Sequence, residues 1–147
     1  MRAVVQRVER AGVSVDGREI ARIGHGLVVL AGFRKNEAEA ALEWMARKIA
    51  SLRVFPDHEG KMTVALDGVG GEILVVSQFT LYADVNKGAR PSFDQSAPAE
   101  EARRLYDRFV ELLRGQTGGR VATGEFQASM KVELVNDGPV TIVIDRE

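Results

Sequence analysis

A polar segment near the middle of the chain carries side chains that could bind or act on a small ligand. Ser77, Gln78, Phe79 and Thr80 directly follow a strongly apolar run, so hydroxyl, amide and aromatic groups gather where a strand leaves the core. In an extended segment Ser77 and Phe79 point to one side, and Gln78 and Thr80 point to the other. One pair would then face a pocket and the other the interior. Hydroxyl groups that merely satisfy neighbouring backbone groups at a strand end explain the segment equally well.

A second segment of interest, residues 136–139, reads Asn-Asp-Gly-Pro. Its simplest interpretation is a turn between two strands. A bond before proline is also the one place where a cis peptide costs only about 0.5–1 kcal/mol. A cis bond between Gly138 and Pro139 would fix two neighbouring carbonyl groups as acceptors, and such a pair could hold an ammonium group. The residue types allow both interpretations.

The remaining residue types argue against several common kinds of catalytic site. The chain has two histidines, His25 and His58, and no cysteine, so a structural zinc site and a thiolate nucleophile are not expected. A Ser-His-Asp triad would need one histidine to meet a serine and an acid across the fold. Both histidines stand in glycine-flanked or turn contexts, which favours ordinary loop residues. Phosphate-binding glycine patterns are also missing. We therefore expect neither a metal nor a cofactor.

Length and composition predict one folded domain covering residues 1–147, with 45% hydrophobic and 28% charged residues. Lysine and arginine total 20 against 21 acidic residues, a formal net charge of −1. This balance argues against a protein that coats nucleic acid, although it allows a small basic patch. No signal-peptide pattern or membrane-spanning run occurs, so we expect a cytosolic protein.

Alternating strands and turn signals predict the elements that must position these residues. Asp16-Gly17 is a strong hairpin signal, and residues 83–97 form a polar loop. We expect strands at residues 2–8, 12–15, 18–23, 27–33, 53–55, 62–65, 72–82, 128–135 and 140–145. Because several strands are linked by hairpins, the pattern favours an α+β fold with a mainly antiparallel, barrel-like sheet.

Two helices are expected to pack on this sheet. The first covers residues 37–52, with Asn36 as its cap and Glu39 completing a capping box. The second opens at Ser96 and Pro98 and stops at Gly115, and apolar residues recur at helical spacing along it.

Taken together, residues 77–81 and 136–141 resemble the two signature motifs of the D-aminoacyl-tRNA deacylase (D-tyrosyl-tRNA(Tyr) deacylase) family. The resemblance covers nearly the whole chain and includes residues 1–17, 87–93 and 123–126. One position departs from the pattern, because Gln127 stands where the family usually has glycine. This side chain adds bulk and polarity near the expected pocket.

The resemblance implies a hydrolase that cleaves the ester bond between tRNA and a D-amino acid, or glycine mischarged on tRNA(Ala). Such an enzyme proofreads chirality in translation. The resemblance also implies a homodimer with its active sites at the subunit interface. Site residues carried over by motif are the catalytic wall Ser77, Gln78, Phe79 and Thr80, and the substrate-binding residues Gly138, Pro139, Arg7, Phe126 and Met130.

In this arrangement Gly138 and Pro139 reach in from the partner, and the arginine fork of Arg7 braces them. The main-chain N–H groups of Phe79 and Thr80 are candidates for an oxyanion hole, and a ribose hydroxyl of the substrate would help the attacking water. An L side chain would clash with protein, whereas a D side chain would not. Thr80 is either a nucleophile or a structural hydrogen bonder, and the lack of a nearby base favours the second role.

The acceptor end of tRNA would be bound by Lys87 and Arg90, with Arg34 and Lys35 as weaker candidates. Each of these is also explained as a solvated surface charge. Two other functions fit the same groove. One is a binding module without catalytic activity, and the other is a hydrolase for different small esters or amides of D-amino acids.

Overall fold

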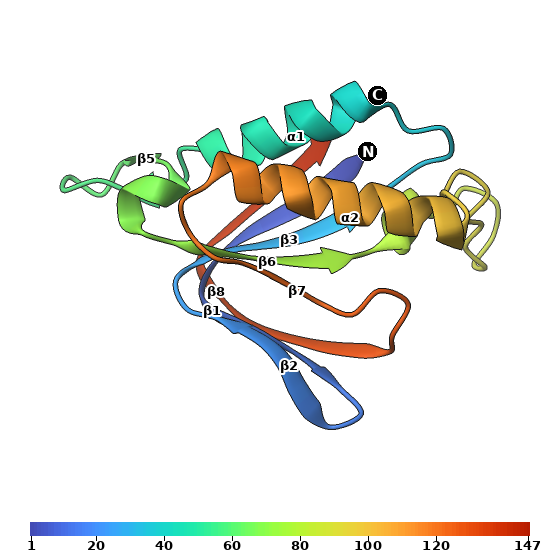
Figure 1. Cartoon of the computed structure of the whole chain (residues 1–147), viewed down its shortest axis with the longest axis horizontal. Helices are drawn as coiled ribbons and strands as arrows, with labels where there is room; N and C mark the ends of the chain where they lie inside the picture. Colours follow the sequence, from blue (N-terminus) through green and yellow to red (C-terminus); the bar gives the residue numbers. More distant parts are fainter.

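The computed structural model describes all residues, 1–147, as a six-stranded sheet with two helices packed against it and a separate two-stranded sheet (Figure 1). The helices are α1 (Glu39–Ser51) and α2 (Ala99–Gln116), with two short 3-10 turns, η1 (Leu66–Val69) and η2 (Phe79–Tyr82). The strands are β1 (Arg2–Val15), β2 (Arg18–Ile23), β3 (Gly26–Gly32), β4 (Phe55–Pro56), β5 (Met62–Val64), β6 (Glu72–Ser77), β7 (Val121–Thr123) and β8 (Met130–Asp145).

Strand β1 organises the sheet because its two halves have different neighbours. The first half pairs with β3 and the second half with β2, while β8 pairs with β1 along almost its whole length, all antiparallel. The sheet continues from β3 to β6 and β7 through parallel pairs. The result is a curled, mixed and mainly antiparallel sheet, which confirms the predicted α+β, barrel-like class. No helix is long and apolar enough to cross a membrane.

Apolar residues fill both faces of the central strands. Leu27 and Val29 of β3 and Val75 of β6 face a core shared with the helices, which lie together over one face of the sheet in Figure 1. Val28 and Leu74 face a second core inside the curl of the sheet. The continuous apolar runs of β3 and β6 follow from burial on both faces.

The predicted strand 72–82 ends earlier than expected. Strand β6 stops at Ser77, and residues 79–82 form η2. A close approach to β3 permits this turn, because a Cβ on Gly32 would lie 2.9 Å from the carbonyl oxygen of Gln78 and 3.0 Å from Cβ of Leu81. The predicted alternation of side chains therefore does not continue past Ser77.

The predicted capping box of the first helix is wrong. Helix α1 begins at Glu39 after Ala38, with no side-chain cap, and Asn36 has a left-handed backbone (φ 55°). Glu37 instead lies buried, 2.7 Å from the N-terminal amino group of Met1. This ion pair links the N-terminus of the chain to the residues just before α1.

The two C-terminal strands predicted at 128–135 and 140–145 are one strand. Strand β8 runs through residues 136–139, and shifts in its register opposite Gln6, Val8 and Arg10 absorb the irregular segment. The Asn136 side-chain oxygen accepts a hydrogen bond from the N–H of Val140 at 3.1 Å. The predicted turn is therefore a bulge within a long strand that pairs with β1. Strand β1 is also continuous, although two strands were expected at residues 2–8 and 12–15.

Other predicted elements agree with the structure more closely. Asp16 and Gly17 adopt positive φ angles of 51° and 77° and join β1 to β2 as a hairpin. Helix α2 starts after Pro98, one residue inside the predicted opening, and ends one residue beyond Gly115. Strand β7 was not predicted, because three residues are too few to show a period.

Candidate active site

The end of β6 opens into a pocket of about 550 Å³. Three of the four predicted catalytic residues, Ser77, Gln78 and Phe79, line it. Another wall comes from the segment between β7 and β8, which includes Phe126, and from Met130 at the start of β8. The fold thus brings together two predicted groups of site residues that lie far apart in the sequence.

Main-chain hydrogen bonds hold the segment at the mouth of this pocket. The N–H of Gln78 donates to the carbonyl of Ala31 at 2.8 Å, and the N–H of Leu81 donates to the carbonyl of Gln78 at 3.2 Å. Leu81 is the first residue of η2 whose N–H donates a hydrogen bond within the turn. The N–H groups of Phe79 and Thr80 come earlier in η2 and have no acceptor in it, as is usual for the first residues of a helical turn. Two donors with no acceptor in their own turn are available for a ligand.

The side chains of this segment make two separate sets of contacts: Gln78 and Thr80 bond to each other, and Phe79 packs against another aromatic ring. Gln78 donates through Nε2 to the hydroxyl of Thr80, which is exposed and does not line the pocket. The Phe79 side chain is 54% exposed and packs edge-on against Phe93, with ring centroids 5.1 Å apart. Ser96, predicted as the start of a helix, donates its hydroxyl to the Phe79 carbonyl at 3.1 Å.

Gln127 lines the same pocket, as expected from its position. Its backbone has a φ of 65°, in the left-handed region that favours glycine. This conformation gives a physical reason for the glycine usual in the related motif. The chain retains the turn with a side chain that adds an amide group to the pocket wall.

Helix α2 supplies the remaining wall with small residues, Ala99 and Ala102, next to Ala97. Sequence reasoning assigned these positions to the helix but not to a site. Beneath them the hydroxyl of Tyr106 donates to the carbonyl of Val75 at 2.9 Å, and burial raises the pKa of Tyr106 well above its usual value. Tyr106 therefore supports the end of β6 as a neutral hydrogen-bond donor.

Arg7, Gly138 and Pro139 lie outside this pocket. The Arg7 side chain is only 10% exposed and donates to the carbonyls of Asp137 at 3.0 Å and Val54 at 2.6 Å. It closes tightly on Gly138, where an added Cβ would lie 3.0 Å from Nη2 of Arg7. The Gly138–Pro139 bond is cis, and both residues are exposed.

His25, expected to be a loop residue, stands beside this cluster. Its Nε2 lies 3.9 Å from a carboxylate oxygen of Asp137, which also contacts Arg7 at 3.4 Å. Its ring packs edge-on against Phe55. His58 lies in the turn between β4 and β5 and is exposed. Neither histidine lines the pocket.

The predicted RNA contacts lie in the loop after η2. Lys87 and Arg90 are exposed, and neither forms an ion pair. The loop is closed by a bridge between Asp84 and Ser92. Of the weaker candidates, Arg34 approaches Glu37 and Glu147 at 3.7 Å each, so its charge is partly used within the chain.

The structure combines a curled sheet, two helices on one face of it and a largely apolar pocket at the end of a central strand. One solved structure, "c-Myc DNA Unwinding Element Binding Protein", matches with a TM-score of 0.95 and 44% identity, over 100% of this chain and 99% of that one. A second, "Structural Analysis of a probable eukaryotic D-amino acid tRNA deacylase", is 20% identical, covers 99% and 98% of the two chains, and shares the fold with a TM-score of 0.86.

Sequence comparisons are more specific. Similar proteins named D-aminoacyl-tRNA deacylase come from Chlorobaculum parvum, 55% identical over 99% of this chain and 97% of the relative, and Symbiobacterium thermophilum, 56% identical over 100% and 97%. The profile of the family described as D-Tyr-tRNA(Tyr) deacylase matches residues 4–145. The chain belongs to this family. The assignment confirms the predicted class of enzyme, an ester hydrolase of the D-aminoacyl-tRNA deacylase type.

Proposed function

We propose that this protein hydrolyses the ester bond between tRNA and a D-amino acid or glycine, with the aminoacyl-adenosine end held in the pocket beside Ser77. The observation that carries the proposal is the pair of N–H groups on Phe79 and Thr80 at the mouth of that pocket, free of their own turn. The name shared by the bacterial relatives supports the choice of substrate.

The main chain supplies most of the catalysis in this account. As water attacks the ester carbonyl, negative charge develops on its oxygen, and the N–H groups of Phe79 and Thr80 stabilise that charge. One such donor typically contributes about 3–4 kcal/mol in the transition state. The ribose hydroxyl next to the ester positions the water. It takes the proton of the water as it passes its own proton to the departing ribose oxygen, so that the tRNA end leaves as a free hydroxyl. The Thr80 hydroxyl keeps a structural role, because it is hydrogen-bonded to the Gln78 side chain.

The active site is completed by a second copy of the chain. Gly138 and Pro139 are exposed, held from behind by Arg7, and do not line their own subunit's pocket. A homodimer in which these residues reach the partner's pocket gives them a ligand to contact. Their carbonyl groups hold the ammonium group of the substrate, so that an L side chain meets protein and a D side chain or a hydrogen atom does not.

The acceptor end of the tRNA crosses the rim formed by Lys87 and Arg90, which are free to meet phosphates. Few phosphates are neutralised by so small a rim, so binding should weaken only gently with salt. The proposed place of action is the cytosol, where charged tRNA is used.

Turnover by purified protein separates this proposal from a binding module. Chelator-treated protein at catalytic concentration should release free D-tyrosine from D-Tyr-tRNA over many cycles. A binding module would instead protect the ester from spontaneous hydrolysis, and that result would overturn the proposal.

Single-turnover measurements then separate the two roles of Thr80. The variant Thr80→Ala removes only the hydroxyl and keeps the N–H, so the proposal expects a rate within about tenfold of the parent, since a mean hydrogen bond contributes about 1 kcal/mol. Loss of all activity, or an acyl-enzyme trapped on Thr80, would show a nucleophile instead.

A further inference from the structure

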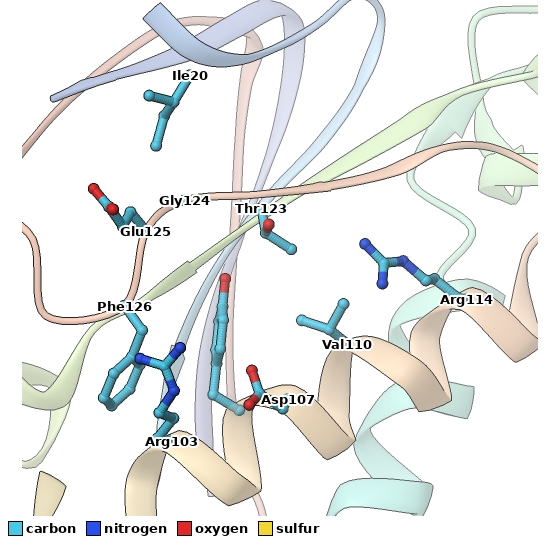
Figure 2. A pocket seen from close by; sticks show the side chains of 10 residues that line it. Ile20, Arg103, Asp107, Val110, Arg114, Thr123, Gly124, Glu125 and Phe126 are labelled. Atoms are coloured by element: carbon cyan, nitrogen blue, oxygen red, sulfur yellow. The ribbon is translucent and has the colours of Figure 1, made fainter. Parts of the chain in front are cut away.

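A second pocket adjoins the candidate active site across Phe126. It has a volume of about 550 Å³ and lies between α2 and residues 123–126, with Ile20 of β2 on the far side (Figure 2). Phe126 lines both pockets, so its ring is the partition between them. The two pockets therefore share this residue as a common wall.

Two arginines of α2 face this second pocket. The guanidinium carbon of Arg103 lies 5.6 Å from the centre of the Phe126 ring, and Arg103 forms no ion pair. Arg114 lies three turns further along the same face of the helix and donates to the carbonyl of Val121 at 3.3 Å. In contrast, Arg108 of the same helix forms an ion pair with Glu39 at 2.5 Å, so its charge is already neutralised within the chain. Figure 2 shows Arg103 beside the Phe126 ring and Arg114 pointing toward the cavity.

Two carboxylates, Asp107 and Glu125, also line the pocket. They offset the two arginine charges, so the pocket does not suit a run of phosphates. It suits a ligand with one phosphate and several N–H donors, because carboxylates accept hydrogen bonds from exocyclic amino groups. A single nucleotide of cytosine, adenine or guanine has this combination, because each of these bases carries an exocyclic amino group.

We propose that the second pocket binds the penultimate nucleotide of the tRNA acceptor end, with Arg103 on the phosphate that joins it to the terminal adenosine. The inference rests on the proposed function, which places that adenosine on the other side of Phe126. Arg103 then acts in substrate binding at a position remote from the ester. Its cation–π contact keeps the guanidinium beside the partition, where the linking phosphate must pass.

Two substrates of different length test this inference. D-Tyr-tRNA carries the linking phosphate, whereas 3′-O-D-tyrosyl-adenosine ends at the nucleoside and cannot reach Arg103. The test variant is Arg103→Glu, and the matched control is Arg104→Glu, which makes the same charge change on an exposed neighbour that does not line the pocket. Arg103→Lys keeps the charge and should recover most of any loss.

The expected result is a fall of at least tenfold in kcat/KM of Arg103→Glu on D-Tyr-tRNA, mostly through KM, because a hydrogen bond to a charged group is lost. The slope of binding against salt should fall by about 0.7, the value for one phosphate of a single strand. Activity on the short ester should not change, and Arg104→Glu should match the parent on both substrates.

Equal losses on both substrates would overturn the inference, because Arg103 would then act within the first pocket or on folding. Equal behaviour of Arg103→Glu and Arg104→Glu would also overturn it. Failure of the unmodified protein to cleave either ester would overturn the proposed function itself, and with it the inference. The parent enzyme's own activity on the short ester therefore distinguishes the two failures.

Discussion

Arg7 offers the sharpest mutational test of how the Gly138–Pro139 segment is held. Its side chain is 10% exposed and donates to two carbonyl groups, those of Asp137 at 3.0 Å and Val54 at 2.6 Å. Lysine keeps the charge, but its single ammonium group cannot span two acceptors in the way the planar fork does. The variant Arg7→Lys thus leaves one acceptor without its donor.

The expected size follows from these contacts. One hydrogen bond to a charged group contributes about 1.5–3 kcal/mol, so Arg7→Lys should lower the free energy of unfolding by about 2 kcal/mol. The control is Arg10→Lys on the same strand, because Arg10 is 58% exposed and contacts only the neighbouring Glu9. That change should cost less than about 0.5 kcal/mol.

Two assays read the consequence. Urea unfolding gives the loss of stability, and the ratio of D-Tyr-tRNA to L-Tyr-tRNA hydrolysis gives the loss of chiral selection. We expect the ratio of Arg7→Lys to fall at least tenfold, about 1.4 kcal/mol, while Arg10→Lys keeps it. If Arg7→Lys equals Arg10→Lys in both stability and selectivity, the bracing argument is refuted.

Individual contacts elsewhere in the fold also have measurable effects on stability. Gly32→Ala should cost about 1–3 kcal/mol and slow deacylation, because its Cβ would lie 2.9 Å from the Gln78 carbonyl; normal activity would refute the tight approach. Gln127→Gly should raise the free energy of unfolding by about 1 kcal/mol by relieving a left-handed backbone (φ 65°), as urea unfolding would measure. Glu37→Gln should cost about 3 kcal/mol, because it leaves the buried N-terminal amino group without its charged partner, and a normal melting temperature would contradict this. A hydrogen bond from a backbone N–H, and then an arginine, lower the pKa of Glu72 below its usual 4.5, so its stabilisation is present above about pH 4.5 and lost as pH falls through the lowered value. Glu72→Gln should therefore flatten the acid side of the stability profile, and an unchanged profile would contradict the assignment.

The parts of the fold that sequence reasoning predicted correctly are those set by local chemistry. Asp16-Gly17 forms its hairpin because both residues accept positive φ, and α2 follows from Pro98 and a regular apolar stripe. The continuous apolar run of residues 27–33 is a central strand because it is buried on both faces.

The incorrect predictions involve contacts between distant residues. The capping box failed because Glu39 pairs with Arg108 of α2, 69 residues away along the chain, and the N–H of Asn36 donates to Glu101, 65 residues away. The turn at 136–139 became a bulge because β1 is long enough to pair across it. No local pattern reports either partner.

The candidate site shows the same division. The residue types of the segment 77–80 indicated one wall of the pocket, and the family resemblance supplied Phe126 and Met130, which line the same pocket. The alternation of side chains does not continue past Ser77, because β6 ends there and η2 begins at Phe79. Arg103 was not found, because an arginine on a charged helix resembles any solvated residue until its pocket is seen.

The most direct test of the central claim is hydrolysis of D-Tyr-tRNA and L-Tyr-tRNA in parallel by purified, chelator-treated protein. We expect rapid loss of the D ester and survival of the L ester, with hydrolysis continuing at catalytic amounts of protein. Survival of the D ester, or equal loss of both esters, would contradict it.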